Sequence, residues 1–183
     1  MRVMTTTVTM VAIALAGALA TAQQAIRTVP VGTQIDLMLA TELTSRTARP
    51  NDRFEADAIV DVKRGGQVVI PAGAVAYGFV GSVRATTPQN HQGQLTPSFD
   101  ELRIGDQVVK LRASVVALFN PKRRPDSTRL GAPVDLADPG AMAPFPGVVI
   151  SPGGSLNSMI AGDVLLPIGV VMRIRLDRAL ELK

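Results

Sequence analysis

The chain has 183 residues and a formal net charge of +4, and it contains no cysteine, no tryptophan, one tyrosine and five phenylalanines. Without cysteine the chain has no disulfide, no thiolate metal site and no lipid-modified cysteine, so a packed core must stabilise it, and this length suffices for one domain. The small charge argues against nucleic acid as a partner, and the shortage of aromatic residues argues against carbohydrate-binding proteins and proteins that stack on bases.

The first 22 residues have the pattern of a secretory signal peptide. Arg2 precedes the apolar residues 10–20, and Ala20-Thr21-Ala22 forms an A-x-A cleavage site. The apolar part is shorter than the about 20 residues that a membrane-spanning helix needs. We therefore expect cleavage near Ala22, a periplasmic or secreted location, and a single β-rich domain over residues 23–183. Retention of residues 1–22 as an anchor is the alternative.

After Gln23 apolar residues alternate with polar ones, which predicts β-strands. The predicted strands are residues 35–40, 54–62, 68–70, 74–83, 99–104, 107–118 and 171–176. Gly65-Gly66 and Gly105-Asp106 are suited to the tight turns of hairpins. The pattern predicts an all-β fold, a single distorted barrel or sandwich of mostly antiparallel strands. The one candidate for helix is residues 155–164, with Ser155 as the cap of one or two turns.

Two segments lack a strand pattern. Residues 84–98 are polar and predict a loop. Residues 120–162 are rich in proline and glycine without a sustained period, and they predict a long, partly mobile loop excursion. The basic run 122–124 is interpreted as part of a solvated loop, with contact to an anionic polymer or lipid as the alternative.

An apolar residue followed by Pro-x-Gly occurs three times. The corners are Pro30 to Gly32, Pro71 to Gly73, and Pro167 to Gly169. Proline at the second position of a type I turn has its φ preset, and glycine at the fourth position accepts the left-handed conformation. We expect each corner to end one strand and direct the next, through a glycine bulge or a sharp bend. The unequal spacing excludes a solenoid or a propeller.

The residues that carry chemistry are sparse. His91 is the only histidine and lies in a polar loop, and no Gly-x-Ser-x-Gly elbow is present. Glu55, Asp57 and Asp61 are placed on one strand face, which is most simply a solvated face; a carboxylate pair of a hydrolase and a calcium site are the alternatives. Residues 151–158 are interpreted as a flexible loop. We therefore predict no catalytic, cofactor or metal site.

Three segments taken together resemble a known family. They are residues 29–45 with the Pro-x-Gly-Thr corner, 53–83 with a strand pair ending in Ile-Pro-x-Gly, and 95–113 with a later strand pair. In this order they resemble the TrbI-type subunit of conjugation and type IV secretion systems. The resemblance implies a distorted periplasmic β-barrel that assembles into the ring of the secretion channel. The chain is also similar to small uncharacterised exported bacterial proteins with the same corners, which end in a strand like residues 167–176.

These observations predict an exported, non-enzymatic β-domain of the cell envelope that acts through protein contacts and needs no cofactor. The partner is another envelope protein or a second copy of the chain, and exposed strand edges together with residues 120–162 are the predicted contact surfaces. One alternative is a small carrier with an apolar ligand inside the barrel. Another is an envelope hydrolase that uses Glu55, Asp57 or Asp61. Peripheral contact with a membrane stays open.

Overall fold

The computed structural model describes residues 27–121 and 142–182, and within them it contains strands and no helix. The strands are β1 Arg27–Val29, β2 Gln34–Leu39, β3 Leu43–Thr44, β4 Arg53–Ala58, β5 Val62–Arg64, β6 Gln67–Ile70, β7 Val75–Arg84, β8 Gln94–Ile104, β9 Gln107–Lys110, β10 Ala113–Pro121, β11 Met142–Pro144, β12 Val148–Ile150, β13 Leu156–Ser158, β14 Leu165–Leu166, β15 Val171–Leu176 and β16 Leu180–Leu182. The all-β prediction is confirmed. The predicted signal peptide and the basic run 122–124 lie outside the described residues.

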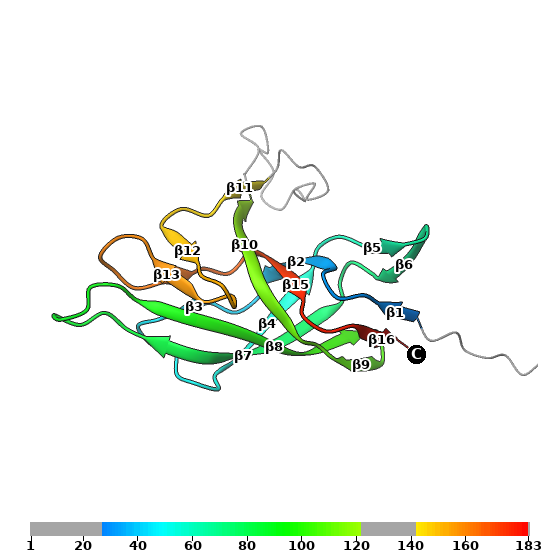
Figure 1. Ribbon diagram of the computed structural model, residues 1–183, viewed down its shortest axis with the longest axis horizontal. Helices are drawn as coiled ribbons and strands as arrows, with labels where there is room; N and C mark the ends of the chain where they lie inside the picture. Colours follow the sequence, from blue (N-terminus) through cyan, green and yellow to red (C-terminus); the bar gives the residue numbers. More distant parts are fainter. Residues whose placement is uncertain (1–26, 122–141, 183) are drawn as a thin grey trace, which may run out of the picture.

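Ten strands form one curled antiparallel sheet, a half-barrel, that runs through the molecule (Figure 1). Their order is β11-β10-β15-β2-β4-β7-β8-β13-β12, with β9 paired to β8 beside this path. Three two-stranded ribbons complete the fold: β1 with β16, β3 with β14, and β5 with β6. In the part of the chain that the structure describes, no helix is long and apolar enough to cross a bilayer.

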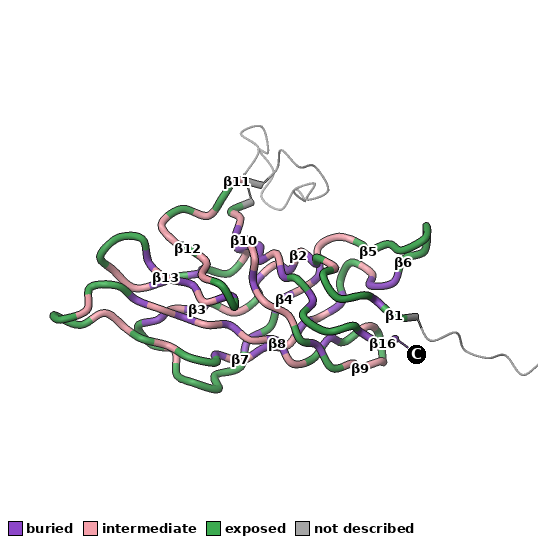
Figure 2. The backbone as a smooth tube through the Cα atoms, in the orientation of Figure 1, coloured by how far each residue is buried: buried purple, intermediate pink, exposed green. Residues whose placement is uncertain are grey.

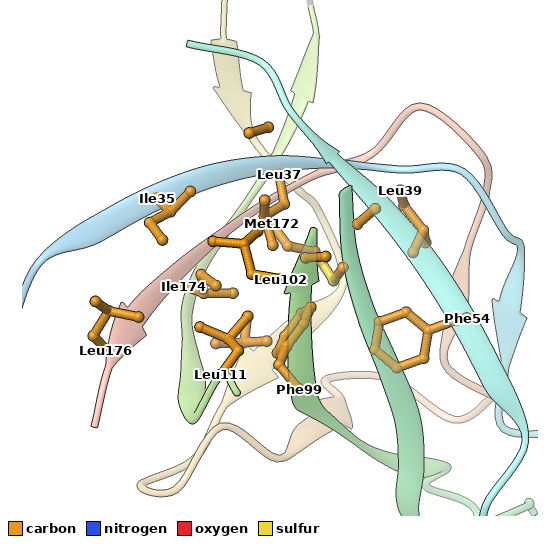
Figure 3. Packing of buried hydrophobic residues seen from close by; sticks show 14 of the residues in the cluster. Ile35, Leu37, Leu39, Phe54, Phe99, Leu102, Leu111, Met172, Ile174 and Leu176 are labelled. Atoms are coloured by element: carbon orange, nitrogen blue, oxygen red, sulfur yellow. The ribbon is translucent and has the colours of Figure 1, made fainter. Parts of the chain in front are cut away.

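The core lies inside the curl of the sheet, where alternate residues of each strand point (Figure 3). Ile35, Leu37 and Leu39 of β2 are buried, and Met172 and Ile174 of β15 pack on the same side. The residues between them are at least partly exposed, so that buried and exposed residues alternate along the central strands (Figure 2). Each fully buried aliphatic side chain contributes roughly 1.5–3 kcal/mol to folding.

The two ends of the sheet order are neighbours in the sequence. β11 and β12 are separated only by residues 145–147. The N–H of Phe145 donates to the C=O of Leu118 in β10 (3.0 Å), and the N–H of Met159 donates to the C=O of Gly147 (2.9 Å). The prediction of a structureless loop over residues 120–162 is therefore wrong for residues 142–158, which form three short strands linking the ends of the curl. Strands of three residues are too short to show an alternating pattern.

Several predicted boundaries differ from the observed ones. The strand predicted over 54–62 ends at Ala58, and the one predicted over 107–118 is divided at residues 111–112 into β9 and β10. The loop predicted over 84–98 is shorter, because β7 extends to Arg84 and β8 begins at Gln94. β8 includes Pro97, and a strand tolerates proline where no neighbour needs its N–H. The helical turn predicted over 155–164 is wrong, since β13 occupies its start.

The three Pro-x-Gly corners share one backbone geometry. In each, the N–H of the residue after the glycine donates to the proline C=O (3.3, 3.2 and 3.3 Å in chain order), and the glycine has a φ of 86°, 84° or 91°. This is a type II turn with proline first and glycine third, whereas the sequence interpretation placed proline second in a type I turn. Positive φ at the third position of this turn favours glycine. The sequence therefore predicted correctly that proline and glycine form a turn, but it placed both residues one position too late in that turn.

Each corner also forms a bulge against the end of a neighbouring strand. The glycine N–H donates to the C=O of one opposing residue, and the N–H of that residue donates to the C=O of the residue after the glycine, at 2.7–2.9 Å. The opposing residues are Leu176, Ala58 and Leu39. Two residues thus face one, which is the glycine bulge that increases the twist of a strand. The corners start β2, β7 and β15, three central strands of the curl.

Candidate functional site

The acidic residues singled out in the sequence do not form one cluster. Glu55 and Asp57 lie on the outer face of β4, opposite Tyr77 and Val75 of β7. Asp61 lies beyond the end of β4, where its Oδ1 accepts the N–H of Ala72 (2.8 Å) and so holds the second corner. The prediction of one strand face for all three carboxylates is therefore wrong. Among residues 27–121 and 142–182, no group of three or more acidic or histidine side chains is placed to hold a metal ion.

His91 is exposed in the loop between β7 and β8. Its side chain is not part of any described cluster, but its backbone carbonyl takes part in a hydrogen bond that holds the loop. Its C=O accepts the N–H of Gly162 (2.8 Å), and the C=O of Gly162 accepts the N–H of Gly93 (2.9 Å). Residues 151–158, interpreted as a flexible loop, contain a turn in which the Ser151 N–H donates to Ser155 C=O (2.8 Å), followed by β13.

Asp163 is the centre of a polar network that ties three segments together. Its carboxylate accepts hydrogen bonds from Ser45 Oγ (2.9 Å), Arg46 Nε (3.1 Å), and the N–H and Oγ1 of Thr86 (3.0 and 3.2 Å). The Thr86 N–H, followed by the hydroxyls and Arg46, lowers the pKa of Asp163 to about 2 although desolvation opposes this shift. Gly93 packs so closely on the network that an added Cβ would lie 2.5 Å from Ser45 Oγ. Sequence reasoning missed this network, because its members are far apart in the chain.

One edge of β8 is left unpaired over part of its length. β7 pairs with β8 along one edge, and the other edge is paired by β13 at residues 94–95 and by β9 at residues 101–104. Just before β10, the Leu111 N–H donates to the C=O of Asp100 (2.8 Å). Among the described residues, no strand pairs with this edge over residues 96–99, which we call the open edge. At about 3.3 Å per residue it is about 13 Å long.

A cleft of about 610 Å³ lies beside the open edge. Its walls are residues 97–101 of β8, residues 110–114 from the end of β9 to the start of β10, Asp177 and Arg178 after β15, and Phe79 and Gly153. β9 pairs with β8, whereas β10 turns away after residues 111–112 and pairs with β15 (Figure 1). The buried Leu111 holds the turn against the core.

The charged groups of the cleft are unequally paired. Asp100 Oδ2 accepts a hydrogen bond from Arg53 Nη1 (2.6 Å), which raises the pKa of Arg53. Asp177 Oδ2 accepts one from Ser114 Oγ (2.6 Å). Arg112 and Arg178 are exposed and form no ion pair with any described residue. The rim therefore presents two unpaired guanidinium groups.

One carboxylate oxygen of Asp100 is a hydrogen-bond acceptor that has no donor among the described residues. Its Oδ1 is buried and accepts no hydrogen bond from the part of the chain that the structure describes. Burying a carboxylate oxygen without a donor costs roughly 1–3 kcal/mol, so such an atom needs an explanation.

The aromatic side chains of β7 lie on the outer face of the sheet, next to the cleft. Tyr77 and Phe79 are half-buried there, and Arg103 stands over the Tyr77 ring (5.4 Å to the centroid). Of the phenylalanines in the described residues, only Phe54 and Phe99 are buried, in an edge-to-face pair (5.4 Å). Gly78 makes room for Phe54, because a Cβ there would lie 2.4 Å from the ring. Exposed aromatic and arginine side chains together are typical of protein interfaces.

No family model matches the chain, and no curated protein matches it. Among solved structures, the chain is similar to ComB10 of the Com type IV secretion system of Helicobacter pylori. The two are 12% identical, the alignment covers 85% of this chain and 90% of ComB10, and the TM-score is 0.47. The resemblance is distant.

The sequence analysis assigned no function to any residue of the cleft. It described residues 99–104 and 107–118 as ordinary strands and named exposed strand edges only in general terms. One signal was available, which is Pro97 within an alternating pattern, since proline in a sheet marks an edge position. Which edge was open depended on where β9, β10 and β13 pair, and no local pattern encodes that pairing.

Proposed function

We propose that this protein is an exported β-domain of the cell envelope that acts through protein contacts without catalysis, as a scaffold of the kind found in secretion channels. The cleft and the open edge of β8 are its principal contact site. The observation that carries the proposal is residues 96–99 of a central strand, left without a strand partner beside a cleft with charged walls. An unpaired strand edge binds an extended segment through main-chain hydrogen bonds.

The sequence supports the proposed location and the proposed role in an envelope assembly. The signal-peptide pattern of residues 1–22 supports export, and the TrbI-like order of corners and strands supports a place in an envelope assembly. The side chains around the cleft support a protein partner, because the half-buried Phe79 offers apolar contact and the exposed Arg112 offers bidentate hydrogen bonding.

The two alternatives have less support. An apolar-ligand carrier needs an apolar cavity, whereas the inside of the curl is occupied by large buried side chains such as Leu37, Leu102 and Leu111 (Figure 3). A hydrolase based on Glu55, Asp57 and Asp61 needs converging carboxylates, whereas Asp61 holds a turn.

Site-specific photo-crosslinking in the native cells tests the proposal. A photoreactive amino acid at Ser98, on the open edge, should yield an adduct with one envelope protein or with a second copy, identified by mass spectrometry. The same amino acid at Val68, exposed on β6, serves as the matched control and should not yield that adduct. A protein that stays uncrosslinked at Ser98, Phe79 and Arg178 under these conditions would overturn the proposal.

A further inference from the structure

Residues 49–52, between β3 and β4, form a turn that matches the three Pro-x-Gly corners. The N–H of Asp52 donates to the C=O of Arg49 (3.1 Å), and the third residue of the turn, Asn51, has a φ of 71°. This is again a type II turn, with proline at its second position and asparagine where the other corners have glycine. Among the described residues, Asn51 is the only one besides the glycines whose φ is positive.

The hydrogen bonds around this turn repeat those of the corners. The Asn51 N–H donates to the C=O of Val80 in β7 (2.7 Å), and the Val80 N–H donates to the C=O of Asp52 (2.9 Å). Two residues therefore face one, as in the glycine bulges of the corners. Val80 directly follows Phe79, the last residue of β7 that pairs with β4. The turn thus starts β4 at the point where its pairing with β7 begins.

Asparagine is the reason why this turn does not match the Pro-x-Gly pattern. Only glycine adopts a positive φ without a steric penalty, but asparagine tolerates it better than most residues that carry a Cβ. The Asp52 side chain accepts the N–H of Arg49 (2.7 Å), which adds a hydrogen bond across the turn. Residues 49–52 therefore keep the geometry of a corner although their sequence lacks its glycine.

The four turns are arranged in two reciprocal pairs. β15, β2, β4 and β7 are consecutive in the sheet, and each of them begins with one of the turns. The turn before β2 binds the end of β15 at Leu176, and the turn before β15 binds the end of β2 at Leu39. In the same way, the turn before β7 binds the end of β4 at Ala58, and residues 49–52 bind β7 at Val80. Each of the two strand pairs is therefore held at both ends.

We infer that residues 49–52 are a fourth corner, and that the four corners together fix the register of β15, β2, β4 and β7. A slip by one residue would move the apolar side chains of a strand to its outer face, and each bulge opposes such a slip because it fits one pairing only. The fourth corner also precedes Arg53, whose guanidinium group binds Asp100 in the wall of the cleft. This inference is independent of the proposed function, because it concerns how the sheet is specified.

Substitutions at Asn51 test the assignment. Asn51→Gly removes the strain of a side chain at positive φ, so the equilibrium constant for unfolding should fall about two- to fivefold. Asn51→Ala keeps a Cβ but tolerates positive φ less well, and it should raise this constant by about the same factor. Gln89→Gly, in the exposed loop between β7 and β8 where φ is not positive, is the matched control and should raise the constant or leave it unchanged. Urea unfolding of the purified protein measures all three.

Hydrogen exchange tests the bulge on the parent protein, so it needs no variant that folds. The amide protons of Asn51 and Val80 should exchange within about tenfold of the rates at Gly73 and Ala58, because the two bulges have the same hydrogen bonds. The amide proton of the exposed Gln89 is the reference and should exchange at least about a hundredfold faster. Nuclear magnetic resonance spectroscopy measures these rates one residue at a time.

Two results would overturn the inference. One is an Asn51→Gly protein that is no more stable than the parent, which would mean that no side chain is strained at this position. The other is exchange of the Asn51 and Val80 amides at the rate of Gln89, which would mean that residues 49–52 are an ordinary surface turn without a bulge.

Discussion

Asp163 shows how one side chain can hold together segments that the sequence keeps far apart. It joins Ser45 after β3, Thr86 after β7, and its own segment before β14. The Val164 N–H donates to Ser45 Oγ (3.0 Å), so the hydroxyl both donates and accepts. The Asp163 side chain is 11% exposed, and a carboxylate with several donors in such a place is strongly favoured in its charged form.

Asp163→Asn should lower the free energy of unfolding at pH 7 by about 1–2 kcal/mol, because an amide accepts fewer and weaker hydrogen bonds. The folded pKa of about 2 lies below the ordinary 3.8, so the network stabilises the protein above about pH 4 and is lost as the pH falls toward 2. Urea unfolding of both proteins between pH 7 and pH 2 measures this. A stability difference that does not shrink below pH 4 would contradict the assignment, and Asp106→Asn at an exposed turn is the control.

At the scale of elements, the three corners answer why one short chain repeats Pro-x-Gly. Each places a turn and a bulge at the start of a strand, beside the last residue of the neighbouring strand. The residues before the prolines, Val29, Ile70 and Leu166, are buried, whereas Val31 and Ile168 in the middle of two corners are exposed. The corners thus change the direction of the chain at the surface while the residue before each proline stays in contact with the core.

Alanine at Gly73 or Gly169 should cost about 1–2 kcal/mol, because a φ of +84° or +91° strains any residue with a Cβ although nothing lies within 4 Å of that Cβ. Ile168→Ala in the same corner should change stability by less than about 0.5 kcal/mol, since Ile168 is 67% exposed. Chemical denaturation measures both. Equal effects of Gly169→Ala and Ile168→Ala would refute the role of the positive φ.

At the scale of the whole molecule, residues 142–158 connect the two ends of the curled sheet. β11 pairs with β10, and β13 pairs with β8 at Leu95 and Gln94. Gly154 packs on β10 so tightly that a Cβ would lie 2.9 Å from the Val115 nitrogen. This bridge places Gly153 in the wall of the cleft, so the same segment that links the ends of the sheet also shapes the candidate site.

Leu156→Ala in β13 should destabilise the protein by about 2–4 kcal/mol, as for any buried leucine, because the side chain is 0% exposed. Val149→Ala in β12, whose side chain is 46% exposed, should cost less than about 0.5 kcal/mol. Thermal and urea unfolding report both values. A Leu156→Ala protein as stable as the parent would mean that residues 142–158 are dispensable for the core, as a simple loop would be.

The sequence by itself determined the all-β class, the inward residues of β2, β4 and β15, and the position of the three corners. These follow from local causes, since alternation shows which side of a strand is apolar, and only glycine accepts the left-handed backbone of the turns. It did not predict the three-residue strands of residues 142–158, the turn type of the corners or the division between β9 and β10.

Only the tertiary structure decided which residues meet. The Asp163 network brings together positions more than a hundred residues apart, and the cleft exists because β9 and β13 cover different parts of the same edge of β8. Strand pairing depends on backbone groups that every residue except proline carries, so apart from Pro97 no residue type in β8 marks which edge is paired and which stays open. The candidate site is therefore a product of pairing and register, while the fold class is a product of residue pattern.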